Sequence, residues 1–265
     1  MTSSAAPAAP STLSAVSSPP PLHAHLDFNS PLSPARAARL VERLAGSGPS
    51  TVLDLGCGWG ELLLRLLAAV PGATGTGVDM NGELLARGRV SAGERGLADR
   101  VTFVEGAVAG FAPGRGDVVL CVGSSHTFGD AAPPAHTEVA LRALRERVDV
   151  GGRVLFGEGF WQRPPTDGEL AAMWPDASAD EQTDLATLVG LAGAAGFRPL
   201  WIETASLDEW EHFESGYLAG KEEWLAANGG HPEAGSVRAA ADAHRAMWLG
   251  YRGILGFAYL TLVAC

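Results

Sequence analysis

The stretch "VLDLGCGWGELLLRLL" carries one acid and three glycines where a strand pattern changes into a helix pattern. Asp54 lies in the apolar run, and Gly56, Gly58 and Gly60 follow on alternate positions. Glycines at such a turn let the chain bend sharply and let a ligand touch the backbone. The helix that begins near Gly60 offers free N–H groups and a positive dipole end, which suit a carboxylate. Asp54, just before the turn, is placed to face a cationic amine.

A second acid, Asp79, ends the next strand pattern, "GTGVDM". A carboxylate there can accept hydrogen bonds from both hydroxyls of a ribose. An amine, a carboxylate and a ribose together describe S-adenosylmethionine. An ordinary tight turn is one alternative. A dinucleotide-binding turn is another, but its spacing is GxGxxG, and Glu61 directly after this GxGxG turn would repel a pyrophosphate.

Strand and helix patterns alternate around these motifs. The strand cores are Val- and Leu-rich runs, which indicates burial on both faces and therefore a parallel sheet covered by helices. Ser33 before Pro34 indicates the start of a first helix. The seven strand candidates span residues 51–56, 73–80, 101–106, 116–123, 152–160, 198–206 and 253–262.

The motifs resemble those of class I S-adenosylmethionine-dependent methyltransferases, over about Ser33 to Ser206 and again in the last strand. "DLGCGWG" is similar to the first motif of that family, "GVDM" to the second and "GDVVLCVGSSHTFG" to the fourth. "HTFG", "EGFW" and the aromatic C-terminal insertion together resemble a group of small-molecule methyltransferases. The resemblance implies an α/β fold with a doubly wound, Rossmann-like seven-stranded sheet, mostly parallel with an antiparallel last strand. It also implies S-adenosyl-L-methionine as cofactor and an in-line methyl transfer to a small-molecule acceptor.

The resemblance also implies which residues hold the cofactor. At the end of the third strand, "VEGAVAGF", the family often has Asp after the glycine, whereas this chain has Ala107, so the backbone of Ala107 and Val108 is expected to hold the adenine edge. The expected cofactor-binding residues are Asp54, Gly56, Cys57, Gly58, Gly60, Asp79, Met80, Gly106, Ala107, Val108 and Cys121.

The acceptor is expected beside the loop "GSSHTFG", which follows the fourth strand. His126 is the ionisable side chain of this loop before Asp130, and its ordinary pKa of about 6.5 suits a general base near neutrality. A hydrogen bond from His126 to backbone or substrate is the alternative. Glu158, at the end of the fifth strand, is a second catalytic candidate that would orient His126 or bind a cationic acceptor; capping a neighbouring loop is its structural alternative.

Residues 207–252 break the alternation and predict a helical insertion of two helices at the sheet edge. Its aromatic residues recur at helical spacing, which is typical of core packing; a lid over an acceptor pocket is the alternative. The candidate substrate-binding residues are Ser125, Trp161, Trp210, Tyr217, Trp248 and Tyr251.

Composition limits the remaining choices. The 265-residue chain has a formal net charge of −11 and no basic run, which argues against nucleic acid and anionic membranes as partners. Three scattered cysteines indicate reduced thiols and a cytoplasmic location. The residues 1–25, rich in Ala, Pro and Ser, predict a disordered tail with no secretory signal, in which the pair His23 and His25 is solvated; no metal site is expected.

Lys221 is the sole lysine, and the preference for Arg suggests a GC-rich bacterial source. A monomer or homodimer is expected. Two alternatives to methyl transfer stay open: a non-catalytic cofactor-binding module, and another S-adenosylmethionine-dependent reaction on the same fold, such as aminopropyl transfer or cyclisation.

Overall fold

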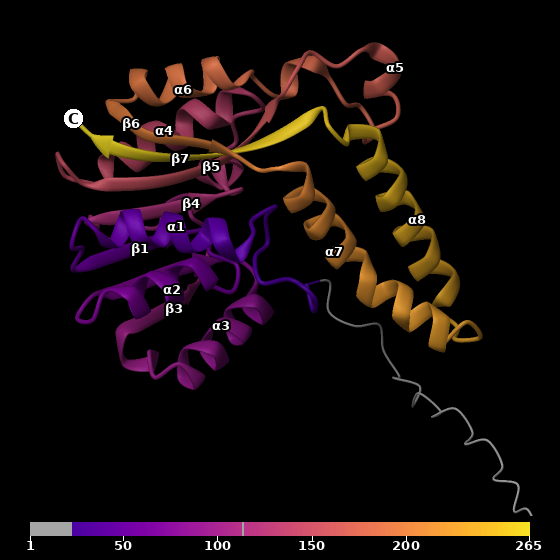
Figure 1. Cartoon of the computed structure of the whole chain (residues 1–265), viewed down its shortest axis with the longest axis horizontal. Coiled ribbons are helices and arrows are strands. Elements are labelled where there is room, and N and C mark those ends of the chain that lie inside the picture. Colours follow the sequence, from indigo (N-terminus) through magenta and orange to yellow (C-terminus); the bar gives the residue numbers. More distant parts are fainter. Residues whose placement is uncertain (1–22, 113) are drawn as a thin grey trace, which may run out of the picture.

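The computed structural model describes residues 23–112 and 114–265, which form an α/β fold around one seven-stranded sheet (Figure 1). The strand order is β3-β2-β1-β4-β5-β7-β6, and only β7 runs antiparallel to its neighbours. The predicted fold class, including the antiparallel last strand, is confirmed. The strands are β1 (Thr51–Leu55), β2 (Thr74–Asp79), β3 (Val101–Glu105), β4 (Val118–Val122), β5 (Arg153–Trp161), β6 (Phe197–Thr204) and β7 (Leu255–Ala264).

Helices cover both faces of the sheet, as the strand composition predicts (Figure 1). One buried cluster joins one face to α1, α2 and α3, and a second joins the other face to α4 and α6. The first helix begins as predicted, with the Ser33 hydroxyl accepting the amide of Arg36 and Pro34 in the first turn. The helices are α1 (Pro34–Ala45), α2 (Glu61–Ala69), α3 (Gly82–Glu94), α4 (Ala135–Glu146), α5 (Asp167–Leu170), α6 (Leu185–Ala194), α7 (Leu207–Ala227) and α8 (Ala234–Tyr251).

Helices α7 and α8 form a two-helix arm between β6 and β7 (Figure 1). Because β6 and β5 both run antiparallel to β7, α7 leaves the sheet at the edge where the parallel strands end. The arm therefore starts on the side of the sheet where ligands bind in open α/β folds.

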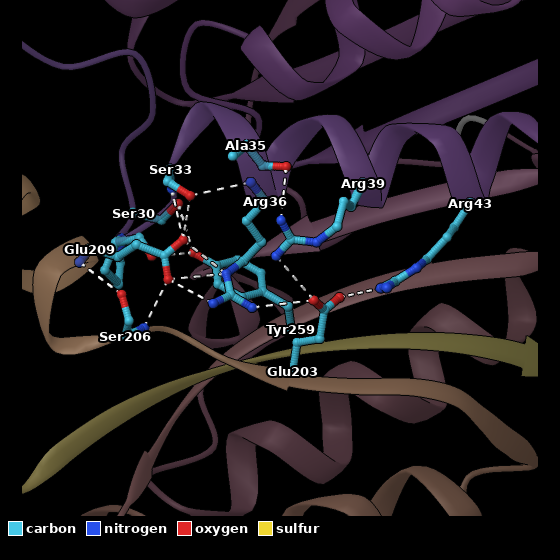
Figure 2. A network of polar contacts seen from close by, with 11 residues as sticks. Ser30, Ser33, Ala35, Arg36, Arg39, Arg43, Glu203, Ser206, Glu209 and Tyr259 are labelled. Atoms are coloured by element: carbon cyan, nitrogen blue, oxygen red, sulfur yellow. Dashed lines mark hydrogen bonds and ion pairs between the residues drawn. The ribbon is translucent and has the colours of Figure 1, made fainter.

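A polar network anchors the base of this arm (Figure 2). The carboxylate of Glu209, in the first turn of α7, accepts hydrogen bonds from Arg36 at 2.8 Å, from the Ser33 hydroxyl at 2.7 Å and from the Ser206 amide at 2.8 Å. Burial alone would raise the pKa of Glu209, but the hydrogen bonds from Arg36 and Ser206 lower it to about 2. Glu203 at the end of β6 pairs with Arg36 and with Arg43, so α1, β6 and α7 are joined by one set of charges.

The segment from His23 to Ser33, here called the strap, packs onto the fold ahead of α1. Its carbonyl groups accept hydrogen bonds from Trp59 (to Asp27, 2.9 Å), from Arg87 (to His23, 2.9 Å) and from Tyr259 (to Pro31, 3.1 Å). The sequence predicted a disordered tail over residues 1–25. Residues 1–22 lie outside the described residues, so the structure describes only the last three positions of that tail. The expectation of a solvated tail is wrong for His23, because its ring lies 5.4 Å from that of Trp59; His25 is exposed, and its ring nitrogen lies 3.5 Å from Glu223.

Among the described residues, no helix combines the length and the apolar composition needed to cross a membrane.

Candidate functional site

A cleft of about 430 Å³ opens at the carboxyl ends of β1, β2 and β4. The strand order reverses between β1 and β4, and such a switch point is where open α/β sheets bind ligands. Its volume lies within the range of small-molecule pockets. Residues from the turn after β1, the end of β2, the loop after β4 and the strap line it together.

The turn after β1 needs its glycines for two different reasons. Gly56, Gly58 and Gly60 all have positive φ, at 75°, 56° and 68°, a region that side chains other than glycine rarely adopt. At Gly56 a Cβ would lie 2.3 Å from the Cβ of Ser124, and at Gly60 it would lie 2.6 Å from the ring of Phe103. At Gly58 nothing lies within 4 Å, so this backbone is open to a ligand in the cleft.

Asp54 lines the cleft as a carboxylate without a counter-ion. It is 6% exposed, and its side chain forms no hydrogen bond within the described part of the chain. Burial, and then the nearby charge of Asp79, raises the pKa of Asp54 to about 8. A buried carboxyl group in this state gains most from a positively charged ligand group, because a cation restores the ionised form.

Asp79 is held in place by two backbone donors. Its Oδ2 atom accepts the amide of Gly58 at 2.8 Å, and its Oδ1 atom accepts the amide of Asn81 at 2.9 Å. Each carboxylate oxygen has a further acceptor position, so the group remains able to receive hydroxyl donors from the cleft. Glu61, which directly follows the turn, is paired with Arg65 and Arg95, each at 2.7 Å.

The other expected cofactor residues divide into two groups. Cys57, Met80, Gly106 and Val108 line the cleft. Gly60 and the exposed Ala107 do not line it. Cys121 is fully buried in the core, with its sulfur 3.4 Å from the Ser124 hydroxyl, and does not reach the cleft either.

The loop after β4 forms a short 3₁₀ helix (Ser125–Phe128) that brings His126 to the cleft. The His126 side chain is exposed and forms no hydrogen bond with a described residue. Ser124 also lines the cleft, and its hydroxyl donates to the carbonyl of Leu55 at 2.6 Å. The cleft therefore holds the candidate base next to the turn that follows β1.

Glu158 lies beneath this loop rather than in the cleft. It is 7% exposed and accepts the amide of Gly159 at 3.0 Å, and the Ser125 side chain lies close enough to act on its carboxyl group. Its Oε2 atom is buried and has no hydrogen-bond partner among the described residues. Burial raises the pKa of Glu158. Its contact with Ser125 connects it to the 3₁₀ helix that presents His126, without a direct bond to that histidine.

The aromatic residues expected at the substrate site lie mainly in the core. Trp161, Trp210, Trp248 and Tyr251 belong to the same buried cluster and do not line the cleft. Trp161 stacks on Trp174 at 6.2 Å. This burial favours packing over a lid for these four residues. Ser125 is buried as well.

Tyr217 does not line the cleft either, but it is half-buried, and its ring lies 5.7 Å from that of His23, which does.

The strap supplies lining residues that the sequence did not reveal. His23, Phe28, Asn29 and Ser30 all face the cleft. The available signal was the appearance of Leu26 and Phe28 directly after the region rich in Ala, Pro and Ser, since both side chains are buried at 3% and 5% exposure. Two apolar residues in such a short segment are too weak a pattern to distinguish a packed strap from a disordered tail.

A doubly wound sheet with a glycine turn and two strand-end acids defines a nucleotide-type cofactor site on a Rossmann-like fold. A family model described as a methyltransferase domain matches residues 52–147, which include this turn and the loop that carries His126. With the relatives below, this match shows that the chain belongs to the class I S-adenosylmethionine-dependent methyltransferases.

Relatives of similar length extend the match to nearly the whole chain. The uncharacterised protein YjhP of Escherichia coli K12 is 30% identical over 242 residues, which are 89% of this chain and 94% of YjhP. A methyltransferase from Geobacter sulfurreducens, crystallised with S-adenosylhomocysteine, is 27% identical with a TM-score of 0.78, over 90% of this chain and 94% of that one. A similar structure from Thiobacillus denitrificans, with the same ligand, is 26% identical with a TM-score of 0.78 over the same shares.

Proposed function

We propose that this protein transfers the methyl group of S-adenosylmethionine to a small-molecule acceptor. The observation that carries the proposal is the cleft itself, where the unpaired carboxyl group of Asp54 meets the glycine turn and Asp79. The cofactor has a cationic amine, a carboxylate and a ribose, and these three cleft features suit those groups. Asp54 would pair with the amine, the open backbone around Gly58 would approach the amino-acid part, and Asp79 would receive the ribose hydroxyls.

The adenine would lie toward Met80, Gly106 and Val108, which form the part of the lining beyond Asp79. Val108 is buried and Met80 is 72% exposed, so one ring face would rest on the fold and the other would be covered by a flexible thioether side chain. Ala107 contributes no carboxylate here, and the backbone next to Val108 would hold the adenine edge.

The cofactor supplies an activated methyl group, and the protein has to align the acceptor, exclude water and remove a proton. The acceptor atom attacks the methyl carbon as the carbon–sulfur bond breaks, and the electron pair of that bond stays on sulfur. His126 is the ionisable cleft residue on the loop after β4, and it would take the proton that the acceptor releases. The strap lines one side of the cleft with Phe28, Asn29 and Ser30 and would limit access of water from that side.

A small acceptor agrees with the electrostatics of the chain. A net charge of −11 repels the phosphate backbone of a nucleic acid. Only a strongly basic surface patch would overcome this repulsion. Cytoplasmic location and a bacterial source are parts of the same proposal, and the similar proteins from Escherichia coli, Geobacter and Thiobacillus support the bacterial source.

The test has two stages. Isothermal titration first measures S-adenosylmethionine and S-adenosylhomocysteine binding to the wild-type chain and to Asp54→Asn. Incubation with methyl-labelled cofactor and a bacterial metabolite extract then traces the label. Label in a small product, absent with Asp54→Asn, supports the proposal.

Other outcomes separate the alternatives. Cofactor binding without any turnover in the extract would point to a non-catalytic cofactor-binding module. Formation of methylthioadenosine in place of S-adenosylhomocysteine would point to aminopropyl transfer. Absence of binding would contradict the proposal as a whole.

A further inference from the structure

Three basic side chains gather around the rings of Trp59 and Tyr217 at the edge of the cleft, where the strap lies against α7; of the three, His23 lines the cleft itself. The guanidinium of Arg87 lies 4.0 Å from the Trp59 ring and donates to the carbonyl of His23 at 2.9 Å. The His23 ring lies 5.4 Å from that of Trp59 and 5.7 Å from that of Tyr217. The Lys221 ammonium lies 4.7 Å from the Tyr217 ring centre. The strap, α3 and α7 thus each contribute one basic group to one small region.

None of these three groups has a carboxylate partner among the described residues. The neighbouring acids pair with other basic groups, and Glu223 on α7 lies 3.5 Å from His25 of the strap. Glu61 is paired with Arg65 and Arg95, and Asp27 lies 3.7 Å from Arg65.

On the arm, the carboxylate of Glu214 is buried at 2% exposure and contacts His244 at 2.6 Å and the hydroxyl of Tyr251. Glu61 and Asp27 act on Arg87 from a distance, but His23 and Lys221 have no acid within ion-pair range among the described residues.

Unbalanced basic groups are unexpected in a chain with 30 acidic and 19 basic residues. Burial and then the charge of Arg87 lower the pKa of His23, with Asn29 acting in the opposite direction and Lys221 adding a smaller lowering; burial lowers the pKa of Lys221. Both shifts mean that the charged forms lack a stabilising anion in the protein without ligand. An anionic group at this place would receive charge-assisted hydrogen bonds from both side chains.

We infer that His23 and Lys221 form a carboxylate-binding subsite at the mouth of the cleft. This subsite rests on the proposed function, since it would serve a ligand of the same cleft. Arg87 is already bound to carbonyl groups of the strap, so it would add positive charge to the subsite without contacting the carboxylate. The rings of Trp59 and Tyr217 form apolar walls. The carboxylate has two possible sources, the amino-acid part of the cofactor and an acid group of the acceptor.

The experiment uses the full-length chain and three substitutions. Lys221→Gln removes the charge, Lys221→Arg keeps it, and Arg238→Gln removes a charge from an exposed position on α8 as a matched control. Melting temperatures confirm that all variants fold. Each protein is titrated with S-adenosylhomocysteine and with 5′-methylthioadenosine, which shares the adenine, ribose and thioether but lacks the amino-acid part. Each is then saturated with S-adenosylhomocysteine and titrated with 4-hydroxybenzoate and with the neutral 4-hydroxybenzamide.

If the cofactor supplies the carboxylate, Lys221→Gln weakens S-adenosylhomocysteine binding about tenfold or more and leaves methylthioadenosine unchanged. If the acceptor supplies it, Lys221→Gln leaves S-adenosylhomocysteine affinity unchanged and weakens 4-hydroxybenzoate binding by a similar factor. The neutral 4-hydroxybenzamide then binds weakly to every variant. In either case Lys221→Arg restores affinity, Arg238→Gln has no effect, and added salt reduces the wild-type advantage.

The subsite is overturned if wild-type and Lys221→Gln proteins bind S-adenosylhomocysteine equally and 4-hydroxybenzoate equally, or not at all. That result would leave the proposed function intact. A wild-type chain that binds no S-adenosylhomocysteine would instead contradict the proposed function, and the subsite with it.

Discussion

The Oδ2 atom of Asp79 accepts the backbone amide of Gly58 at 2.8 Å, so the acid that ends β2 also fixes the glycine turn after β1. The two residues lie 21 positions apart in the chain, Asp79 at the end of β2 and Gly58 in the turn after the neighbouring parallel strand β1. One carboxylate thereby shapes the backbone that faces the ligand while its remaining acceptor positions face the cleft. Binding and loop geometry are coupled in this one side chain.

Replacement of Asp79 by Ala is expected to weaken S-adenosylmethionine binding by about 2–3 kcal/mol, the scale of hydrogen bonds to charged groups. Both the ribose contact and the anchor of Gly58 would be lost. Isothermal titration measures the effect, with the exposed Glu94→Ala on α3 as a charge-matched control. Unchanged affinity in a folded Asp79→Ala protein would remove the ribose assignment.

Asp54 should make cofactor binding depend on pH. Its pKa of about 8 in the unliganded protein means that much of it is protonated at pH 7. A cationic amine favours the ionised form, so binding at pH 7 should release a proton and strengthen as the pH rises toward 8. Titration in buffers of different ionisation enthalpy counts the released proton, and Asp54→Asn should abolish it. An equal proton count in both proteins would contradict the pairing.

The same residue should lower the stability of the unliganded protein. Because the folded pKa is raised from 3.8 to about 8, the folded state binds the proton more tightly, and stability falls as the pH rises between these values. Asp54→Asn should therefore melt higher than the wild type at pH 8.5, with little difference near pH 4. Thermal unfolding at the two pH values checks this, and a constant difference would exclude Asp54 as the cause.

Gly56 and Gly58 should respond differently to the same substitution. Gly56→Ala combines a φ of 75° with a contact of 2.3 Å to the Ser124 Cβ, whereas Gly58→Ala has only the backbone cost of a φ of 56°. We expect Gly58→Ala to cost about 1 kcal/mol of unfolding free energy and Gly56→Ala about 2–4 kcal/mol. Because Ser124→Gly also removes the hydrogen bond to Leu55, it is the reference: in a Ser124→Gly background, Gly56→Ala should cost only about 1 kcal/mol in a denaturant titration. Equal losses in both single variants would show that the Ser124 contact is not limiting.

These glycines show which parts of the molecule a sequence can reveal. The turn after β1 and the acid after β2 are local patterns, and the apolar runs that alternate with helix patterns predicted the seven strands and the insertion. The strap was missed because its contacts are distant in sequence: Trp59 reaches Asp27 across 32 positions, and Tyr259 reaches Pro31 across 228. Cys121 was assigned to the cofactor by the resemblance, but its side chain is fully buried on the face of β4 that packs against α4 and α6.

The last prediction concerns His126, which lies where the acceptor must meet the methyl group. A general base typically contributes about a hundredfold to ten-thousandfold to the rate. His126→Asn should therefore leave cofactor affinity nearly unchanged, lower kcat by that order and remove the acid limb of the pH–rate profile. Glu158→Gln is the comparison, because Glu158 contacts Ser125 and not His126; it should lower kcat less and keep the acid limb. A thiol or neutral amine acceptor needs little proton removal, so a fall below tenfold with the acid limb intact would reject His126 as the base. Alignment in the cleft and exclusion of water by the strap would then account for the rate, with His126 as a positioning contact.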